Sequence, residues 1–291
     1  MGKNYSFLRF PDFKLRALTF SFDDGMVEDV WLVNLFKKYG MKGTFNLNSC
    51  VLKMTEEPKP NHIGRCRLSK TQLVELFKDS GMEVAVHGVN HLSLAEVPTT
   101  AMITDVLEDR ISLENTFGCI VNGMAYANGS LSDEVVDVLK MCDIKYARTV
   151  ESTLRFDIPK DWLRMPATCH FRNGKLTELT DAFLQDYAPD LHYIKKLPRL
   201  FYVWGHSYEL REFDTYEVME QFAERVGSRD DIWYATNIEV YNYVKAFDSL
   251  VYAANKEFVF NPSGTDVYLC WFGKDVVVPA GKTVELPKFP Y

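Results

Sequence analysis

"TFSFDDGMVEDV", residues 19–30, places two adjacent aspartates and a glycine directly after a run that is typical of a buried strand. Carboxylates this close raise one another's pKa, so the pair costs stability unless a cation or a proton transfer uses it. The segment that follows, to Gly40, has the apolar period of a helix, with acidic residues in its first turn and lysines in its last. The stretch therefore predicts a strand and a helix with carboxylates in the turn between them.

The same alternation of strand and helix continues along most of the chain. Further strands are predicted at 43–48, 82–86, 120–126, 144–149, 200–204 and 232–235. Helices are predicted at 70–81, behind a Ser69–Gln72 capping box, and at 99–117, 133–141, 177–187, 215–226 and 238–251. Repeated strand–helix units predict parallel strands joined by crossover helices, hence an α/β barrel or a doubly wound sheet.

The pattern changes after Ala254. The turns "NPSG", "FGKD" and "PAG" separate short apolar runs, which predicts three or four antiparallel strands. We therefore predict a βα body over residues 1–254 and a small β-rich extension over 255–291 that packs on it. The extension offers a surface for sugar recognition or oligomerisation, or a cover for the open edge of a barrel.

Composition excludes some classes of partner. The chain has 291 residues and a net charge of −7, with no basic run, so nucleic acid is not expected to bind. No stretch approaches the roughly 20 apolar residues of a membrane span. The first residues lack the roughly 7–15-residue apolar core of a signal peptide, which predicts a cytoplasmic protein, or a secreted or cell-surface one if a leader has been removed.

Two histidines follow another predicted strand, in "MEVAVHGVNHLSL". An i, i+4 spacing would put the rings of His87 and His91 on one side of a helical turn. With one aspartate of the pair they make three ligands and leave a position for water, which is the set of a catalytic zinc site. Turn chemistry and two unrelated histidines are the plain alternatives. Both motifs, however, fall at the carboxyl ends of predicted strands, where such folds build active sites.

"TFSFDDG" and "HGVNH" together resemble the first two motifs of the polysaccharide deacetylase family, carbohydrate esterase family 4. The resemblance implies an irregular (β/α)7-type barrel and a metal-dependent hydrolase that removes N- or O-acetyl groups from a carbohydrate. It implies that Asp24, His87 and His91 hold one divalent ion, Zn²⁺ foremost, while Co²⁺, Ni²⁺, Mn²⁺ and Fe²⁺ also suit such ligands. It implies that Asp23 is the general base that takes a proton from the attacking water.

The third family motif is altered in "MAYANGS", residues 124–130, where the loop and its glycine match but the arginine and proline do not. The resemblance implies that a backbone N–H near Asn128 helps to bind the oxyanion, and that Tyr126 and Asn128 contact substrate. Another donor must then orient Asp23. We predict that this donor is Arg148, at the end of the next strand, with an ordinary salt-bridged barrel arginine as the alternative.

The histidine of the fifth family motif has a counterpart in "LFYVWGHSYEL", residues 200–210. The resemblance implies that His206 protonates the leaving amine or alkoxide, a role that suits the ordinary pKa of imidazole. Trp204 is expected to stack on a sugar, or else to pack in the core. Two other functions stay open: hydrolysis of another C–N bond, such as a cyclic amide, and non-catalytic carbohydrate binding.

Overall fold

Strand β3 (Arg16–Asp23) carries the first motif into the centre of a parallel sheet. The computed structural model describes residues 2–3 (backbone alone), 6–54 and 57–288, and every residue of β3 is buried in it. Successive side chains of a strand point to opposite faces. Of the apolar ones on β3, Leu18, Phe20 and Phe22 enter the main core, whereas Ala17 packs in a second cluster. The polar side chains of Ser21 and Asp23 instead meet other polar groups, because Asn46 Nδ2 donates to both, at 2.8 Å each.

Eight strands follow one another across this sheet. In spatial order they are β8 (Met165–Ala167), β7 (Tyr146–Ser152), β6 (Gly123–Ala125), β5 (Glu83–Val86), β4 (Thr44–Leu47), β3, β10 (Arg199–His206) and β9 (Cys169–His170). The ladders between them are parallel, and β11 (Ile232–Tyr234) also pairs in parallel with the first half of β3. The predicted parallel α/β architecture is therefore confirmed.

The two edges of the sheet meet at Thr168. This residue alone separates β8 from β9 in the sequence, although the two strands lie at opposite ends of the sheet order. Its backbone N–H donates to Tyr202 O at 2.8 Å, and its hydroxyl accepts from the Tyr202 N–H at 3.0 Å. No ladder pairs β8 with β9 among the described residues. The barrel is thus irregular and is not closed by strand hydrogen bonds.

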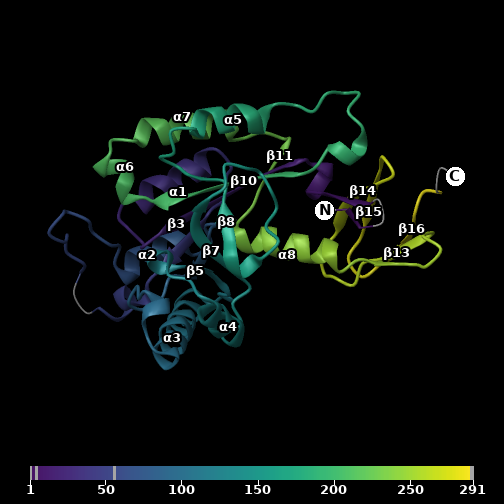
Figure 1. Cartoon of the computed structure of the whole chain (residues 1–291). Coiled ribbons are helices and arrows are strands. Elements are labelled where there is room, and N and C mark those ends of the chain that lie inside the picture. Colours follow the sequence, from purple (N-terminus) through teal and green to yellow (C-terminus); the bar gives the residue numbers. More distant parts are fainter. Residues whose placement is uncertain (1, 4–5, 55–56, 289–291) are drawn as a thin grey trace.

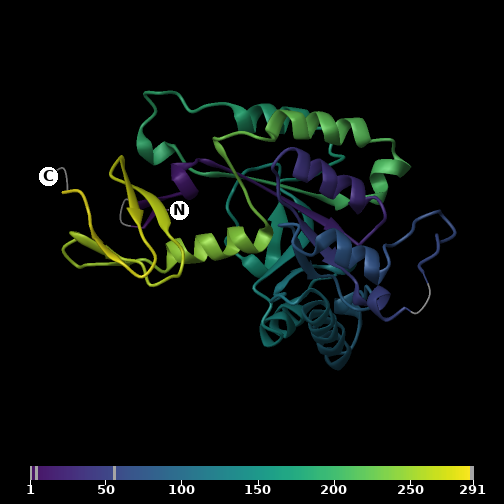
Figure 2. The ribbon, with the colours of Figure 1, turned by 180° about the vertical axis from the view of Figure 1, so that it is seen from behind.

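Helices cover the outside of the sheet (Figures 1 and 2). They are α1 (Asp29–Lys38), α2 (Lys70–Phe77), α3 (Thr99–Phe117), α4 (Asp133–Met141), α5 (Leu176–Leu184), α6 (Tyr208–Glu212), α7 (Tyr216–Val226) and α8 (Asn237–Asp248). Short 3₁₀ helices span Pro11–Phe13, Ser49–Lys53, Leu94–Glu96, Ala127–Gly129, Trp162–Arg164 and Tyr193–Lys195. The predicted capping box opens α2, where Ser69 Oγ accepts from the Gln72 N–H and Gln72 Oε1 accepts from the Ser69 N–H.

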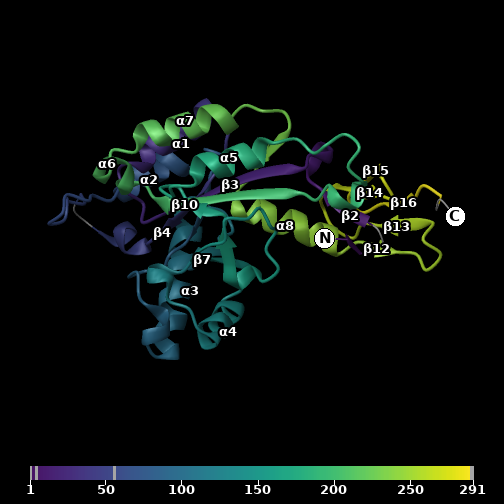
Figure 3. The ribbon, with the colours of Figure 1, turned by 45° about the horizontal axis from the view of Figure 1, so that its top comes forward.

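Two small antiparallel sheets lie at the end of the molecule away from α6 (Figures 1 and 3). One contains β1 (Gly2–Lys3), β2 (Ser6–Arg9), β14 (Val267–Trp271) and β15 (Lys274–Val278). The other contains β12 (Val251–Tyr252), β13 (Phe258–Phe260) and β16 (Thr283–Glu285). The predicted antiparallel tail is present, but β2 joins it from the other end of the chain. Helix α8 ends earlier than predicted, because residues 251–252 pair with β13. The domain boundary at residue 254 remains a prediction.

Across the described part of the chain, none of the helices has both the length and the apolar content needed to span a bilayer.

Candidate active site

The two sequence motifs lie together at one end of the barrel, where the parallel strands have their carboxyl ends. Asp23 ends β3, His87 directly follows β5, and His206 ends β10 in register with Asp23. Every predicted site residue except Arg148 lines a cavity of about 330 Å³ at this end of the barrel. The lining residues are Asp23, Asp24, Arg65, His87, His91, Tyr126, Asn128, Val150, Trp204, His206 and Tyr208.

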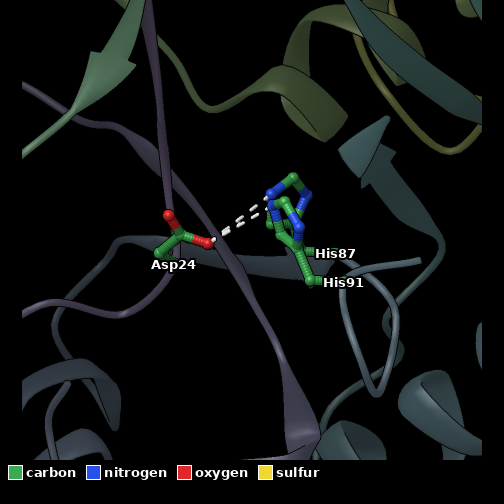
Figure 4. Close-up of side chains that lie close together, drawn as sticks. All are labelled: Asp24, His87 and His91. Atoms are coloured by element: carbon green, nitrogen blue, oxygen red, sulfur yellow. Dashed lines mark ion pairs between the residues drawn. The ribbon is translucent and has the colours of Figure 1, made fainter. Parts of the chain in front are cut away.

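Asp24 and the two histidines converge on one point of this cavity (Figure 4). Asp24 lies in the turn after β3 with a left-handed φ of 82°, and its N–H donates to Asn46 O at 2.9 Å. Its Oδ1 lies 3.8 Å from His87 Nε2 and 3.7 Å from His91 Nε2. The turn therefore directs Asp24 toward the histidines, while Asp23 stays in the strand.

The "HGVNH" segment is a loop, so the predicted helical turn is wrong. Gly88 has a φ of 79° and His91 a φ of 55°, both left-handed. A Cβ on Gly88 would stand 2.2 Å from Asp105 Oδ2, which restricts this position to glycine. Helix α3 holds the loop: Asp109 Oδ2 accepts from the His87 N–H at 3.0 Å, and Asp105 Oδ1 accepts from the Asn90 N–H at 3.0 Å. The loop still brings the two rings together, with centroids 4.8 Å apart.

The donor set at this point fits a divalent cation. His87 Nδ1 lies 2.9 Å from Ala125 O and donates to it, so Nε2 carries the free lone pair. That Nε2 atom is buried and has no hydrogen-bond partner among the described residues. Burial lowers the pKa of His87 although Asp23 and Asp24 oppose it, which favours the neutral ring that binds metal. The ligand atoms of Asp24, His87 and His91 all lie within 4.8 Å of one another.

Asp23 is a buried carboxylate held by two donors. Asn46 Nδ2 donates to its Oδ1 at 2.8 Å, and an Nη of Arg148 donates to its Oδ2. The Arg148 guanidinium is fully buried, donates from Nε to Ser21 Oγ at 3.1 Å, and lies over the Trp204 ring at 4.4 Å. Burial tends to raise the pKa of Asp23, but the charge of Arg148, followed by those of the nearby histidines, lowers it to about 2. Asp23 is therefore ionised at neutral pH.

His206 faces Asp23 across the cavity and rests on Glu209. Its ring atom Nε2 lies 3.8 Å from Asp23 Oδ2, and its ring atom Nδ1 lies 3.6 Å from Glu209 Oε2. The backbone N–H of His206 donates to the same Oε2 at 3.1 Å. Glu209 also lies 2.9 Å from His170 Nε2 and accepts from Arg172 Nη1 at 2.9 Å. Burial tends to lower the pKa of His206, but Glu209 and Asp23 raise it above its ordinary value.

The three predicted substrate residues line the cavity in different ways. Tyr126 is buried and its hydroxyl donates to Leu163 O at 2.6 Å, so only its ring is presented. Asn128 has a left-handed φ of 55°, and its Nδ2 donates to Ser93 Oγ at 3.1 Å. Trp204 is 8% exposed and buried in the core, and its ring contacts Arg148 and His170. Substrate contact by these side chains remains a prediction.

Sequence reasoning missed several residues of the site. Asn46 is a polar residue within a buried strand, and Glu209 stands three residues after His206, so a local signal for each existed. Arg65 gave no such signal, because it lies in a polar loop. Its guanidinium reaches the cavity by stacking over the Tyr208 ring at 3.5 Å.

A parallel barrel with an aspartate and two histidines at the carboxyl ends of its strands is an arrangement suited to a metal-assisted hydrolase. Residues 11–147 match the sequence model of the polysaccharide deacetylase family, which confirms the resemblance carried by "TFSFDDG" and "HGVNH". No curated protein matches the chain.

Solved structures extend the similarity beyond the matched residues. A protein assigned to the polysaccharide deacetylases from Mycobacterium smegmatis is 15% identical, covers 83% of this chain and 94% of its own, and has a TM-score of 0.56, which supports the fold. A family 4 carbohydrate esterase from Streptomyces lividans in complex with acetate is 12% identical over 76% and 92% of the two chains, with a TM-score of 0.47. A Streptococcus pyogenes deacetylase in complex with acetate is 22% identical, covers 45% of this chain, and has a TM-score of 0.41. The present chain spans 55% of that deacetylase.

Proposed function

We propose that the protein is a metal-dependent hydrolase that removes N- or O-linked acetyl groups from a carbohydrate. The observation that carries the proposal is the convergence of Asp24, His87 and His91 beside Asp23, with His206 opposite. When bound by these three ligands, a divalent cation supplies a Lewis acid that polarises a carbonyl and makes water more acidic. The ligand set favours Zn²⁺ and also accepts Co²⁺, Ni²⁺, Mn²⁺ or Fe²⁺.

Asp23 acts as the general base in this proposal. It is ionised at neutral pH, so it can accept a proton from the water that attacks the acetyl carbon. Asn46 and Arg148 fix both of its oxygens, so the carboxylate does not have to reorient during the reaction. Arg148 takes the orienting role that the altered third motif leaves open.

His206 acts as the general acid. Its raised pKa favours the protonated ring near neutral pH, and its Nε2 faces Asp23 across the cavity. As the C–N or C–O bond of the acetyl group breaks, Nε2–H gives its proton to the departing nitrogen or oxygen. Water has by then given one proton to Asp23 and its remaining OH to the acetyl carbon, so the product leaves as acetic acid and releases its last proton to solvent to become acetate. Transfer of the proton from Asp23 to His206 restores both groups. The Glu209 carboxylate, 3.6 Å from Nδ1, favours the positive charge that the ring carries before this transfer.

A screen for acetate release from acetylated oligosaccharides, with metal content measured on the same sample, tests the proposal. Asp23→Asn should retain the ion and lose activity, because the base is gone and the ligands remain. His91→Ala should lose both. His192→Ala, at an exposed histidine away from the cavity, serves as the control. Full acetate release by Asp23→Asn, or ring opening of cyclic amides without acetate release, would contradict the proposed reaction.

A further inference from the structure

A second cavity, of about 380 Å³, adjoins the active-site cavity. The two share Asp24, Arg65, His91 and Tyr208 as lining residues. The charged side chains of the second cavity are mostly basic: Lys59, Arg65 and Arg67 line it, whereas Asp24 is the one carboxylate among its described lining residues. The described lining of this cavity therefore offers guanidinium donors next to the candidate metal site, in a protein whose net charge is −7.

The backbone brings both arginines to this cavity from an extended segment. The Val27 N–H donates to Cys66 O at 3.0 Å and the Leu68 N–H donates to Gly25 O at 2.8 Å, so residues 66–68 lie against the turn that contains Asp24. Arg67 itself forms a β-bridge with Met26. Residues two apart in an extended chain point to the same side, so Arg65 and Arg67 face the cavity together.

The two guanidinium groups differ in how they are held. Arg65 donates to both oxygens of Glu212, at 2.6 and 2.8 Å, so its charge is balanced by an acidic partner on α6. Among the residues that the structure describes, Arg67 makes only long polar contacts, 3.5 Å from Nη2 to Asp24 Oδ1 and 3.4 Å from Nη1 to Cys50 Sγ. Its side chain is 28% exposed. Arg67 therefore directs strong donors into the cavity, and its nearest carboxylate among the described residues is Asp24, at 3.5 Å.

Asp24 cannot balance Arg67 when it also serves as a ligand. The Asp24 oxygen nearest to Arg67 is the same Oδ1 that faces both histidines. A cation held by this oxygen would take up its negative charge, and Arg67 would then have no balancing carboxylate among the described lining residues. Met26, Val51, Met54 and Pro58 form apolar walls, which strengthen the attraction of an anion because they displace water.

We propose that this cavity binds an anionic group, a carboxylate or a phosphate, on the acetylated saccharide, and that Arg67 is its principal contact. The inference rests on the proposed deacetylase function and names its substrate class: an acidic rather than a neutral saccharide. A planar guanidinium can donate two parallel hydrogen bonds to a carboxylate or to a phosphate. A cavity that binds neutral sugars has no need of a charged donor of this kind. Because the two cavities share residues, the anionic group lies next to the acetyl group that is removed.

Three probes test the substrate class by their kcat/KM for acetate release. The neutral probe is the trimer of N-acetylglucosamine, the carboxylate probe is a tetrasaccharide of alternating glucuronic acid and N-acetylglucosamine, and the phosphate probe is N-acetylglucosamine 6-phosphate. Arg67→Gln should lower the ratio of anionic to neutral kcat/KM about tenfold to hundredfold, as expected for one lost charged hydrogen-bonding partner. A loss with one anionic probe identifies the anion. An unchanged ratio with both would overturn the proposal.

Matched variants separate recognition from general charge effects. Arg225→Gln removes the same charge from α7, where Arg225 pairs with Asp181 outside the cavity, and should leave the ratio unchanged. Arg67→Lys keeps the charge but not the two parallel donors, and should give an intermediate ratio. It also replaces Arg67→Gln if circular dichroism shows that the glutamine variant does not fold. Equal ratios for wild type and both Arg67 variants contradict the assignment.

Binding without turnover keeps this inference distinct from the deacetylase proposal. Calorimetric titration of metal-loaded Asp23→Asn protein, which should retain the ion without turnover, with the carboxylate and phosphate probes should show weaker binding when Arg67→Gln is added than when Arg67 is present. Equal binding overturns the anion site. If no probe releases acetate from the metal-loaded protein but Arg67→Gln still weakens anion binding, the proposed reaction fails and the anion site stands.

Discussion

Replacement of Arg148 by methionine tests the link between Asp23 and its buried partner. Methionine keeps an unbranched stem but removes the guanidinium, which contacts Asp23, Ser21 and the backbone of Thr149 and lies over the Trp204 ring. Asp23 is 3% exposed, so it would become a buried carboxylate without its cation. Breaking a buried pair from one side costs about 3–5 kcal/mol of unfolding free energy.

The same change should also slow the reaction. Asp23 would keep only Asn46 as a fixed donor, and a misplaced general base loses on the order of 10²-fold in rate. Arg148 contacts none of the three candidate ligands in the structure, so metal content should remain that of wild type. The assay combines urea unfolding, kcat for acetate release and metal analysis on one preparation of Arg148→Met.

A double-mutant cycle isolates the pair. In an Asp23→Asn background no buried charge is left behind, so adding Arg148→Met should cost less than about 2 kcal/mol. Arg164→Met is the control, because Arg164 pairs at the surface with Asp133 and Asp161 and should cost less than about 1 kcal/mol. A stability loss below about 1 kcal/mol for Arg148→Met, with kcat within about twofold of wild type, would refute the reasoning.

Two further predictions concern stability. Burial raises the pKa of Glu83 to about 7 from 4.5, against opposing hydrogen bonds from the Ile238 N–H, Tyr146 and Thr44. The folded chain then holds a proton that the unfolded chain has released, so the stability of wild type relative to Glu83→Gln should fall by about 2–3 kcal/mol as pH rises through this interval. Urea unfolding of both proteins at about pH 5 and about pH 8 measures this, and a pH-independent difference would contradict it. Ser69→Ala removes the N-cap of α2 and should lower the free energy of unfolding by about 1 kcal/mol. Thr71→Ala, at an exposed position of the same helix, should lower it by less. Equal losses of stability in thermal unfolding would count against the capping box.

Local sequence signals predicted most of the elements. Helices α3 and α4 have the predicted bounds, and the Ser69–Gln72 capping box is present, because periodicity and caps depend on neighbours within a few residues. The helical turn expected for His87 and His91 was wrong because spacing alone does not determine φ. Gly88 and His91 adopt left-handed backbone conformations, and Asp105 and Asp109 of a distant helix hold the loop. Pairing of β2 with β14 joins segments near opposite ends of the chain, which no local pattern reports.

The sequence by itself determined which chemical groups stand at the ends of strands: Asp23 and Asp24 after the first long strand, His87 after another, and His206 after a late one. The carboxyl ends of parallel strands lie at the same end of a sheet, so the position of each group after its strand was enough to predict that these groups approach one another. Tertiary structure alone decided which partners each group meets. Sheet curvature brings Arg148 to Asp23, α6 brings Glu209 to His206, and the extended segment before α2 brings Arg65 and Arg67 to the cavity. Such contacts depend on distances between elements far apart in sequence, which the register and packing of the folded barrel determine.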